Sequence, residues 1–167
     1  MNTMKQPLAL IAVLSLFLMG CYNNQMKRIE KLEKQMFATT NAINPNVASD
    51  LVSAYCDFAV ANPNDEKAPE CLFKAVDVSM NLNEPQRTIY IIDELLEKYP
   101  DYPRTQAALF AKAFIFETRY ENLDMAKKLY EQYLALYPDG EFAADCTASI
   151  ENLGLTPEEI IKKFENQ

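Results

Sequence analysis

A proline-containing joint recurs three times along this sequence at a nearly constant interval. The three segments are Asn62-Pro63-Asn64-Asp65, Tyr99-Pro100-Asp101 and Tyr137-Pro138-Asp139-Gly140, and their prolines are 37 and 38 residues apart. A period of this length is typical of stacked helix pairs, in which each unit buries its apolar face against its neighbours. The interval therefore favours a helical repeat architecture over any fold built on a sheet.

The residues around each proline predict helices with one buried face. Apolar side chains stand eight, five and four residues before the proline, a spacing that places them on one side of a helix. Mostly small residues stand five and eight past it, where neighbouring helices can approach closely. The first set is Tyr55, Phe58 and Ala59, then Ile92, Leu95 and Leu96, then Tyr130, Tyr133 and Leu134; the second is Ala68 and Cys71, Thr105 and Ala108, then Ala143 and Cys146.

These patterns predict an all-α fold, a solenoid of antiparallel helix pairs with a C-terminal capping helix. Only three glycines occur in 167 residues, and strand-like alternation is hard to find. Thr156 and Glu159 form a capping box that opens the last helix, and Pro85 and Pro103 are expected in first turns. The expected helices are 48–61, 66–81, 84–98, 103–120, 122–136, 140–153 and 157–165.

The first twenty residues have the pattern of a secretory signal peptide. Lys5 supplies a positive charge, residues 8–19 are apolar apart from Ser15, and the run stops at Cys21. Leu18-Met19-Gly20-Cys21 resembles the lipobox of bacterial lipoproteins, which implies cleavage before Cys21 and lipidation of its sulfur and amine. Since Tyr22 and not Asp follows the cysteine, the resemblance implies the periplasmic face of the outer membrane.

Three segments follow from this interpretation: a signal peptide over 1–20, an anchor with a short spacer helix and linker over 21–46, and a repeat domain over 47–167. Residues 26–37 form a charged helix with Ile29, Leu32 and Met36 on one face. It covers about two heptads, which is short for a coiled coil. Either it packs on the first repeat as a spacer or it drives self-assembly, and residues 39–49 read as a linker or turn.

The repeats resemble a known family. Ala126, Tyr130 and Pro138 are spaced like the Ala, Phe and Pro of the second helix and exit turn of a tetratricopeptide repeat, and Phe110 matches the large aromatic of its first helix. The period is longer than that family's, and in this the chain is similar to divergent repeats of envelope proteins, such as the BamD-type outer-membrane assembly lipoproteins and the CpoB-type Tol-associated proteins. The resemblance covers about residues 48–154.

Two positions depart from that family's pattern, since Phe114 stands where it prefers Gly and Glu117 where it prefers Tyr. In tetratricopeptide proteins the first helix of each pair lines the concave, partner-binding side. The resemblance therefore implies a surface for an envelope protein or peptide segment. Its residues would be Lys74, Asn81, Ala111, Ile115 and Thr118.

Several kinds of chemistry lack their usual residues. The chain has no His and no Trp, no phosphate-binding loop and no serine-elbow motif, so we expect no enzymatic activity, no cofactor and no metal site. The net charge is −8, which argues against nucleic acid. Cys56 and Cys71 lie at similar distances on either side of Pro63, but they fall on opposed helix faces, so a disulfide between them stays an open question.

The expected function is a lipid-anchored scaffold that mediates protein–protein interaction in the cell envelope, for example in outer-membrane assembly or envelope maintenance. Two alternatives remain. One is an accessory lipoprotein that binds a glycan or other small ligand in nutrient capture, and the other is a structural spacer that self-assembles through residues 26–37.

Overall fold

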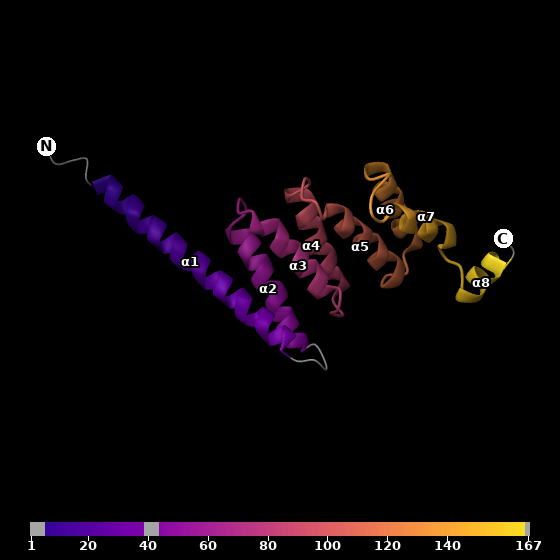
Figure 1. Cartoon of the computed structure of the whole chain (residues 1–167), viewed down its shortest axis with the longest axis horizontal. Coiled ribbons are helices and arrows are strands. Elements are labelled where there is room, and N and C mark those ends of the chain that lie inside the picture. Colours follow the sequence, from indigo (N-terminus) through magenta and orange to yellow (C-terminus); the bar gives the residue numbers. More distant parts are fainter. Residues whose placement is uncertain (1–5, 39–43, 166–167) are drawn as a thin grey trace. The chain divides into compact units, whose positions relative to one another are not determined.

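The computed structural model describes residues 6–38 and 44–165, and this part of the chain is all helix and turn. Lys5 and residues 39–43 of the expected linker lie outside the described residues. Most consecutive helices pack against one another in an antiparallel-like order consistent with a helical repeat array, so the expected all-α fold is confirmed (Figure 1). The helices of the described part are α1 (Gln6–Phe37), α2 (Pro45–Ala61), α3 (Lys67–Ser79), α4 (Pro85–Lys98), α5 (Thr105–Thr118), α6 (Leu123–Leu136), α7 (Ala143–Asn152) and α8 (Pro157–Glu165).

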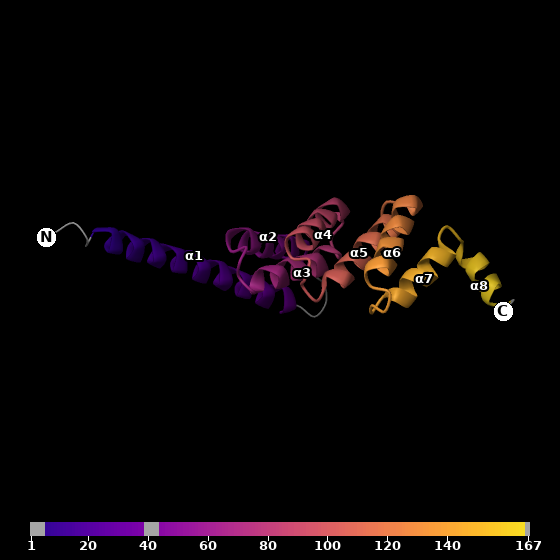
Figure 2. The ribbon, with the colours of Figure 1, turned by 90° about the horizontal axis from the view of Figure 1, so that it is seen from above.

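The chain divides into two compact units, a first unit that ends at Leu82 and a second unit that begins at Asn83. In the first unit, α2 packs against both α1 and α3. Figures 1 and 2 both show the C-terminal half of α1 running beside α2. In the second unit, α5 packs against α4 and α6, and α6 packs against α7.

The side-chain burial follows the repeat pattern of the sequence. Eight and five residues before each proline, all six side chains are buried, and the positions four residues before it are buried or half-buried. Among the small residues after the proline, five of six are buried and Ala143 is half-buried. The period of 37–38 residues is therefore the spacing at which one packed helix face returns to the core.

The third proline joint is closed by a tyrosine that packs inside the second unit. Tyr133 is fully buried, and its Oη donates to Gln106 Oε1 at 3.0 Å and accepts from the backbone N–H of Phe142 at 3.0 Å. A Cβ at Gly140 would lie 2.6 Å from that Oη, 2.8 Å from Gln106 Oε1 and 2.9 Å from Tyr137 Cβ, so a larger residue fits there only if these neighbours shift. This tyrosine is a packing residue and does not face a ligand site.

The first helix begins earlier than residue 26, and it packs on α2, as one of the two alternatives for residues 26–37 predicted. It is continuous through Cys21, and Ile29 and Leu32 are buried, with exposed fractions of 3% and 9%. Within the described residues, no helix has both the length and the apolar character needed to cross a membrane. Because the apolar face of residues 26–37 is already packed in the first unit, it offers little surface for a coiled coil.

Helix boundaries agree with the expected ones to within about three residues, with two local corrections. α2 starts inside the expected linker, because the Asn44 side chain accepts backbone N–H bonds and Pro45 takes the first helical position. Pro103 lies before α5 and not in its first turn. The capping box is confirmed, since Thr156 N donates to Glu159 Oε2 at 2.8 Å and Glu159 N donates to Thr156 Oγ1 at 3.2 Å.

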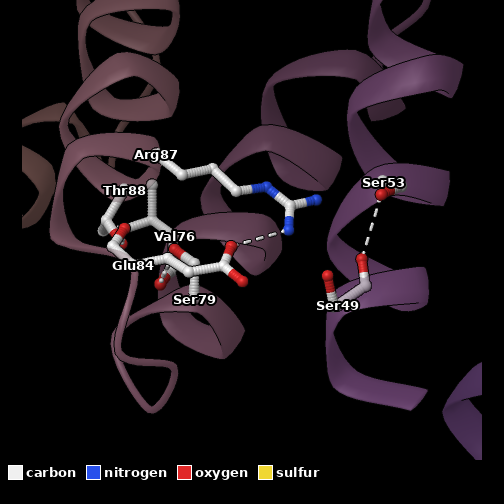
Figure 3. A network of polar contacts seen from close by, with 7 residues as sticks. All are labelled: Ser49, Ser53, Val76, Ser79, Glu84, Arg87 and Thr88. Carbon is white, nitrogen blue, oxygen red and sulfur yellow. Dashed lines mark hydrogen bonds and ion pairs between the residues drawn. The ribbon is translucent and has the colours of Figure 1, made fainter. Parts of the chain in front are cut away.

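The buried hydroxyl groups of Ser79 and Thr88 donate to backbone carbonyl groups about one helical turn earlier in the chain (Figure 3). Ser79 Oγ donates to the carbonyl oxygen of Val76 at 3.0 Å, and Thr88 Oγ1 donates to that of Glu84 at 3.3 Å. At the start of α4, Arg87 pairs with the Glu84 carboxylate at 3.0 Å. Such bonds remove the desolvation cost of a buried hydroxyl, so these residues contribute to folding and do not mark a site.

Candidate binding groove

A groove of about 560 Å³ is lined by all three helices of the first unit. Its volume is within the range of sites that hold a small molecule or a few side chains of a peptide. α1 contributes half of the lining, and α2 contributes one tyrosine. The lining residues are Glu30, Glu33, Lys34 and Phe37 of α1, Tyr55 of α2, and Lys74, Asp77 and Val78 of α3.

A connected set of polar contacts links the three helices at this groove. Tyr55 Oη donates to Glu33 Oε1 at 2.6 Å. Lys74 Nζ lies 3.5 Å from the same oxygen, 3.1 Å from Glu70 Oε1 and 5.9 Å from the centre of the Tyr55 ring. Each helix thus contributes one partner to a tyrosine–carboxylate–ammonium set that orders this part of the groove.

Tyr55 and Lys74 each keep one protonation state over the physiological pH range. Burial raises the pKa of Tyr55 above its usual value, and the hydrogen bond to Glu33 raises it further, so the phenol stays neutral and donates. Burial lowers the pKa of Lys74, but Glu70 and Glu33 more than offset that effect and raise it overall. The groove therefore keeps one lysine cation beside its tyrosine.

The remaining lining offers both charge and apolar surface to a partner. Glu30, Lys34 and Asp77 are exposed, and Phe37 is 74% exposed at the end of α1. Val78 is almost fully buried beneath them. An exposed phenylalanine beside charges of both signs suits a peptide segment that brings one apolar side chain and polar flanks.

Of the two candidate residues in the first unit, one lines the groove. Lys74 belongs to it, as described above. Asn81 lies in the turn after α3, where it is exposed and its Nδ2 donates to the carbonyl oxygen of Asp77 at 3.2 Å. Asn81 therefore closes the end of α3 and does not line the groove.

The three candidates in the second unit lie on α5, and one of them is not on the surface. Ile115 is only 2% exposed, because it stands seven residues after the buried Ala108 and shares its helix face. A partner cannot reach it in this structure, which corrects the expectation. Ala111 is half-buried and Thr118 is exposed. Between them on α5 lies an exposed phenylalanine, Phe114, at 43%.

Sequence reasoning missed the glutamates that hold the buried tyrosines. Tyr55 donates to Glu33 in the first unit, and Tyr130 donates to Glu117 Oε2 in the second, both at 2.6 Å. A buried Tyr where Phe would suffice signals that its hydroxyl has a partner. The sequence carries that signal, but it does not indicate which of 24 acidic residues accepts the hydrogen bond from the tyrosine.

The described part of the chain contains no group of three or more metal-binding side chains, and no buried side-chain N or O atom there lacks a hydrogen-bond partner. A second hollow, of about 690 Å³, is lined by residues 83–87 and Tyr90 of one continuous segment. The groove of the first unit is the better candidate site because three helices build it.

The four cysteines differ in how far they are exposed to solvent. The sequence left open whether Cys56 and Cys71 form a disulfide, and in the described chain no disulfide joins them. Burial raises the pKa of Cys71 and of Cys146 to about 11, which makes both thiols unreactive at neutral pH. Cys21 is exposed on α1.

Comparison with known proteins identifies no family. No protein-family model matches the sequence, and no curated protein matches it. The chain is an all-helical protein whose described helices pack sequentially in pairs.

Proposed function

We propose that this protein is a lipid-anchored scaffold of the bacterial cell envelope, which holds a segment of another envelope protein in the groove of its first unit. The observation that carries the proposal is the shared helix: α1 holds Cys21, the expected lipidation site, and also contributes half of the groove lining. The same helix would therefore fix the protein to the membrane and present the binding site.

The contacts of α1 support this coupling. Tyr22, the residue after the cysteine, already packs on Phe58 of α2, with ring centres 5.4 Å apart. Further along the helix, Arg28 pairs with Asp57 at 3.1 Å. A mature chain that began at Cys21 would have no loose tether between its anchor and its first unit, so a bound partner would be held at high effective concentration beside the lipid.

The groove chemistry favours binding and not catalysis. Its tyrosine is locked as a neutral donor and its lysine as a cation, so neither is poised to exchange a proton near neutral pH. The resemblance to tetratricopeptide proteins of the envelope supports a peptide or protein partner. The resemblance of residues 18–21 to a lipobox, without Asp at position 22, supports the periplasmic face of the outer membrane.

Site-specific photocrosslinking in cells tests the proposal. A photoreactive residue at Phe37 reports on the groove, and one at Val60 is a matched control, because both are apolar, belong to the first unit and are exposed at 74% and 69%. We expect a discrete crosslinked product from Phe37 and none from Val60. The same products from both positions, or none from Phe37, would contradict a partner in the groove.

The anchor is tested separately. Cys21→Ala removes the sulfur that a lipid would modify, so we expect the variant to leave the membrane fraction or to keep its first twenty residues. Mass spectrometry of the wild-type protein should show acyl chains on the peptide that begins at Cys21. An unmodified cysteine in membrane-extracted protein would overturn the lipoprotein assignment while leaving the groove untested by this measurement.

A further inference from the structure

We infer that the outer face of α1 after Cys21 lies along an anionic phospholipid surface, with three lysines contacting the headgroups. The inference rests on the proposed anchorage at Cys21 and adds an orientation to it. An anchor alone fixes one point of the chain and leaves the first unit able to rotate about it. A charged helix face beside the anchor supplies the second contact.

The three lysines share one face of the helix. Lys27, Lys31 and Lys34 follow one another at spacings of four and three residues, and all three are exposed. At 100° per residue this face is opposite the one that carries Ile29 and Leu32, which are buried in the first unit. Packing within the unit therefore turns the lysines outward, and Lys34 stands at the edge between this face and the groove.

The ammonium groups of these three lysines are not occupied by salt bridges within the described chain and can contact an external anionic surface. None of the three makes a salt bridge within the described part of the chain, whereas Arg28 on the flank pairs with Asp57. The lysines line a hollow of about 380 Å³ on the surface of α1, together with Glu30, Gln35 and Ala38. Glu30 is the single acidic residue among them, so the hollow keeps a positive balance.

The positive charge of this helix contrasts with the rest of the molecule. Residues 22–37 hold four basic and two acidic residues, whereas residues 38–167 hold 11 basic and 22 acidic ones. An anionic surface attracts the first segment and repels the second. Charge complementarity therefore favours an anionic lipid surface as the occupant of this helix face.

The length of the helix makes the orientation measurable. Thirteen residues separate Cys21 from Lys34. At about 1.5 Å per residue, an upright helix would lift Lys34 roughly 20 Å above the anchor. That is more than two Debye lengths of about 8 Å at physiological salt, so salt would screen Lys34 of an upright helix from the headgroup charges. A lying helix instead brings all three lysines to the headgroups.

The test compares lysine reactivity on two kinds of vesicle. The full lipidated protein is reconstituted into vesicles of phosphatidylethanolamine and phosphatidylglycerol, or of phosphatidylcholine alone, and acetylated briefly with an amine-reactive ester. Mass spectrometry gives the rate at each lysine. We expect Lys27, Lys31 and Lys34 to react at least threefold more slowly on the anionic vesicles, and 0.5 M salt to remove the difference because it shortens the Debye length to about 4 Å.

Controls lie within the same chain. Lys127 and Lys128 are exposed on α6, and their rates should not depend on the lipid. Lys31→Gln should raise the rates of Lys27 and Lys34 on anionic vesicles, whereas Lys128→Gln should not. Slowed reaction at Lys27 with full reactivity at Lys34 would overturn the lying orientation.

Flotation of the vesicles separates the two hypotheses. A chain that floats with neither kind of vesicle lacks the anchor, which overturns the anchorage at Cys21 and this inference with it. A chain that floats with both kinds, but whose lysines react equally on both, keeps its anchor and overturns only the lipid-facing surface.

Discussion

The first and second units hold a buried tyrosine in the same way and surround it differently. Tyr55 and Tyr130 both stand eight residues before a joint proline, and both donate to a glutamate of the preceding helix at 2.6 Å. In the first unit that glutamate also meets Lys74, at the groove. In the second unit Tyr130 packs beside Phe110, with ring centres 5.9 Å apart, within a closed core.

The difference shows that the same repeat position serves core packing at Tyr130 and borders the candidate binding groove at Tyr55. Aromatic side chains fill the space around Tyr130: Phe110 stacks on Phe142 with ring centres 4.6 Å apart, and Tyr133 lies beside both. Around Tyr55 the corresponding neighbours are charged, and part of the space is open to solvent. One repeat position therefore supports two roles, which depend on the side chains around it.

The largest expected effect comes from truncating the two tyrosines. Tyr130→Ala leaves a cavity in a filled core and should lower the free energy of unfolding by about 3–5 kcal/mol. Tyr55→Ala should cost roughly 1–2 kcal/mol less, because the groove lets water or Lys74 occupy the space. Urea unfolding of both variants measures the two losses of unfolding free energy. A larger loss for Tyr55→Ala than for Tyr130→Ala would contradict the proposed difference between the two units.

Alkaline pH should destabilise both units by titrating one thiol in each. Burial raises the pKa of Cys71 and of Cys146 in the folded protein to about 11, whereas thiols in the unfolded chain have a pKa near 9. The contribution of each thiol to the free energy of unfolding is therefore fully present below pH 9 and is lost as the pH rises to 11. Each thiol contributes at most about 1.4 kcal/mol per pH unit in that window. Cys71→Ala and Cys146→Ala should each flatten the dependence of the unfolding free energy on pH. Unchanged slopes would mean that these thiols do not cause the loss of stability at alkaline pH.

Removing only the hydroxyl groups sharpens the comparison. Tyr130→Phe leaves Glu117, which makes no salt bridge in the described chain, without its tyrosine donor, and should cost about 2 kcal/mol. Tyr55→Phe should cost about 1 kcal/mol, since Glu33 keeps the Lys74 contact. Thermal unfolding of the two variants measures the difference; equal losses would mean that the lysine contributes nothing to holding Glu33.

The smallest effect on stability is expected for Lys74→Ala. Its side chain is 45% exposed, so losing its ion pairs should cost under about 1 kcal/mol. The same change should reduce the crosslinking yield from a photoreactive residue at Phe37, because it removes the ordered cation of the groove. Lys128→Ala is the control, and a similar yield from both variants would exclude a role for Lys74 in binding.

Much of the fold could be predicted from the sequence because helix periodicity and capping are local. The side chains at fixed offsets from Pro63, Pro100 and Pro138 are buried as their spacing requires. The capping box at Thr156 forms as written. The start of α2 was missed, although Asn44 followed by Pro45 is a strong helix-start signal, because the surrounding asparagines resemble a turn.

Less of the candidate site could be predicted, because it joins residues from three helices. Lys74 was placed by resemblance, whereas Glu33 and Tyr55 become groove residues only when α1 and α3 both contact α2. Ile115 shows the opposite error. The resemblance to tetratricopeptide proteins implied that it lies on a partner-binding surface, but it stands seven residues after Ala108 on the buried face of α5.

By itself, the sequence determines which residues form helices and which face of each is apolar, since a rise of 1.5 Å and a turn of 100° per residue relate every side chain to its neighbours along one helix. Tertiary structure alone decides which helix faces meet. The contact of α1 with α2 brings Glu33 to Tyr55, and it leaves Lys27, Lys31 and Lys34 on the outside. Such pairings depend on packing between distant segments, and no spacing within one helix specifies them.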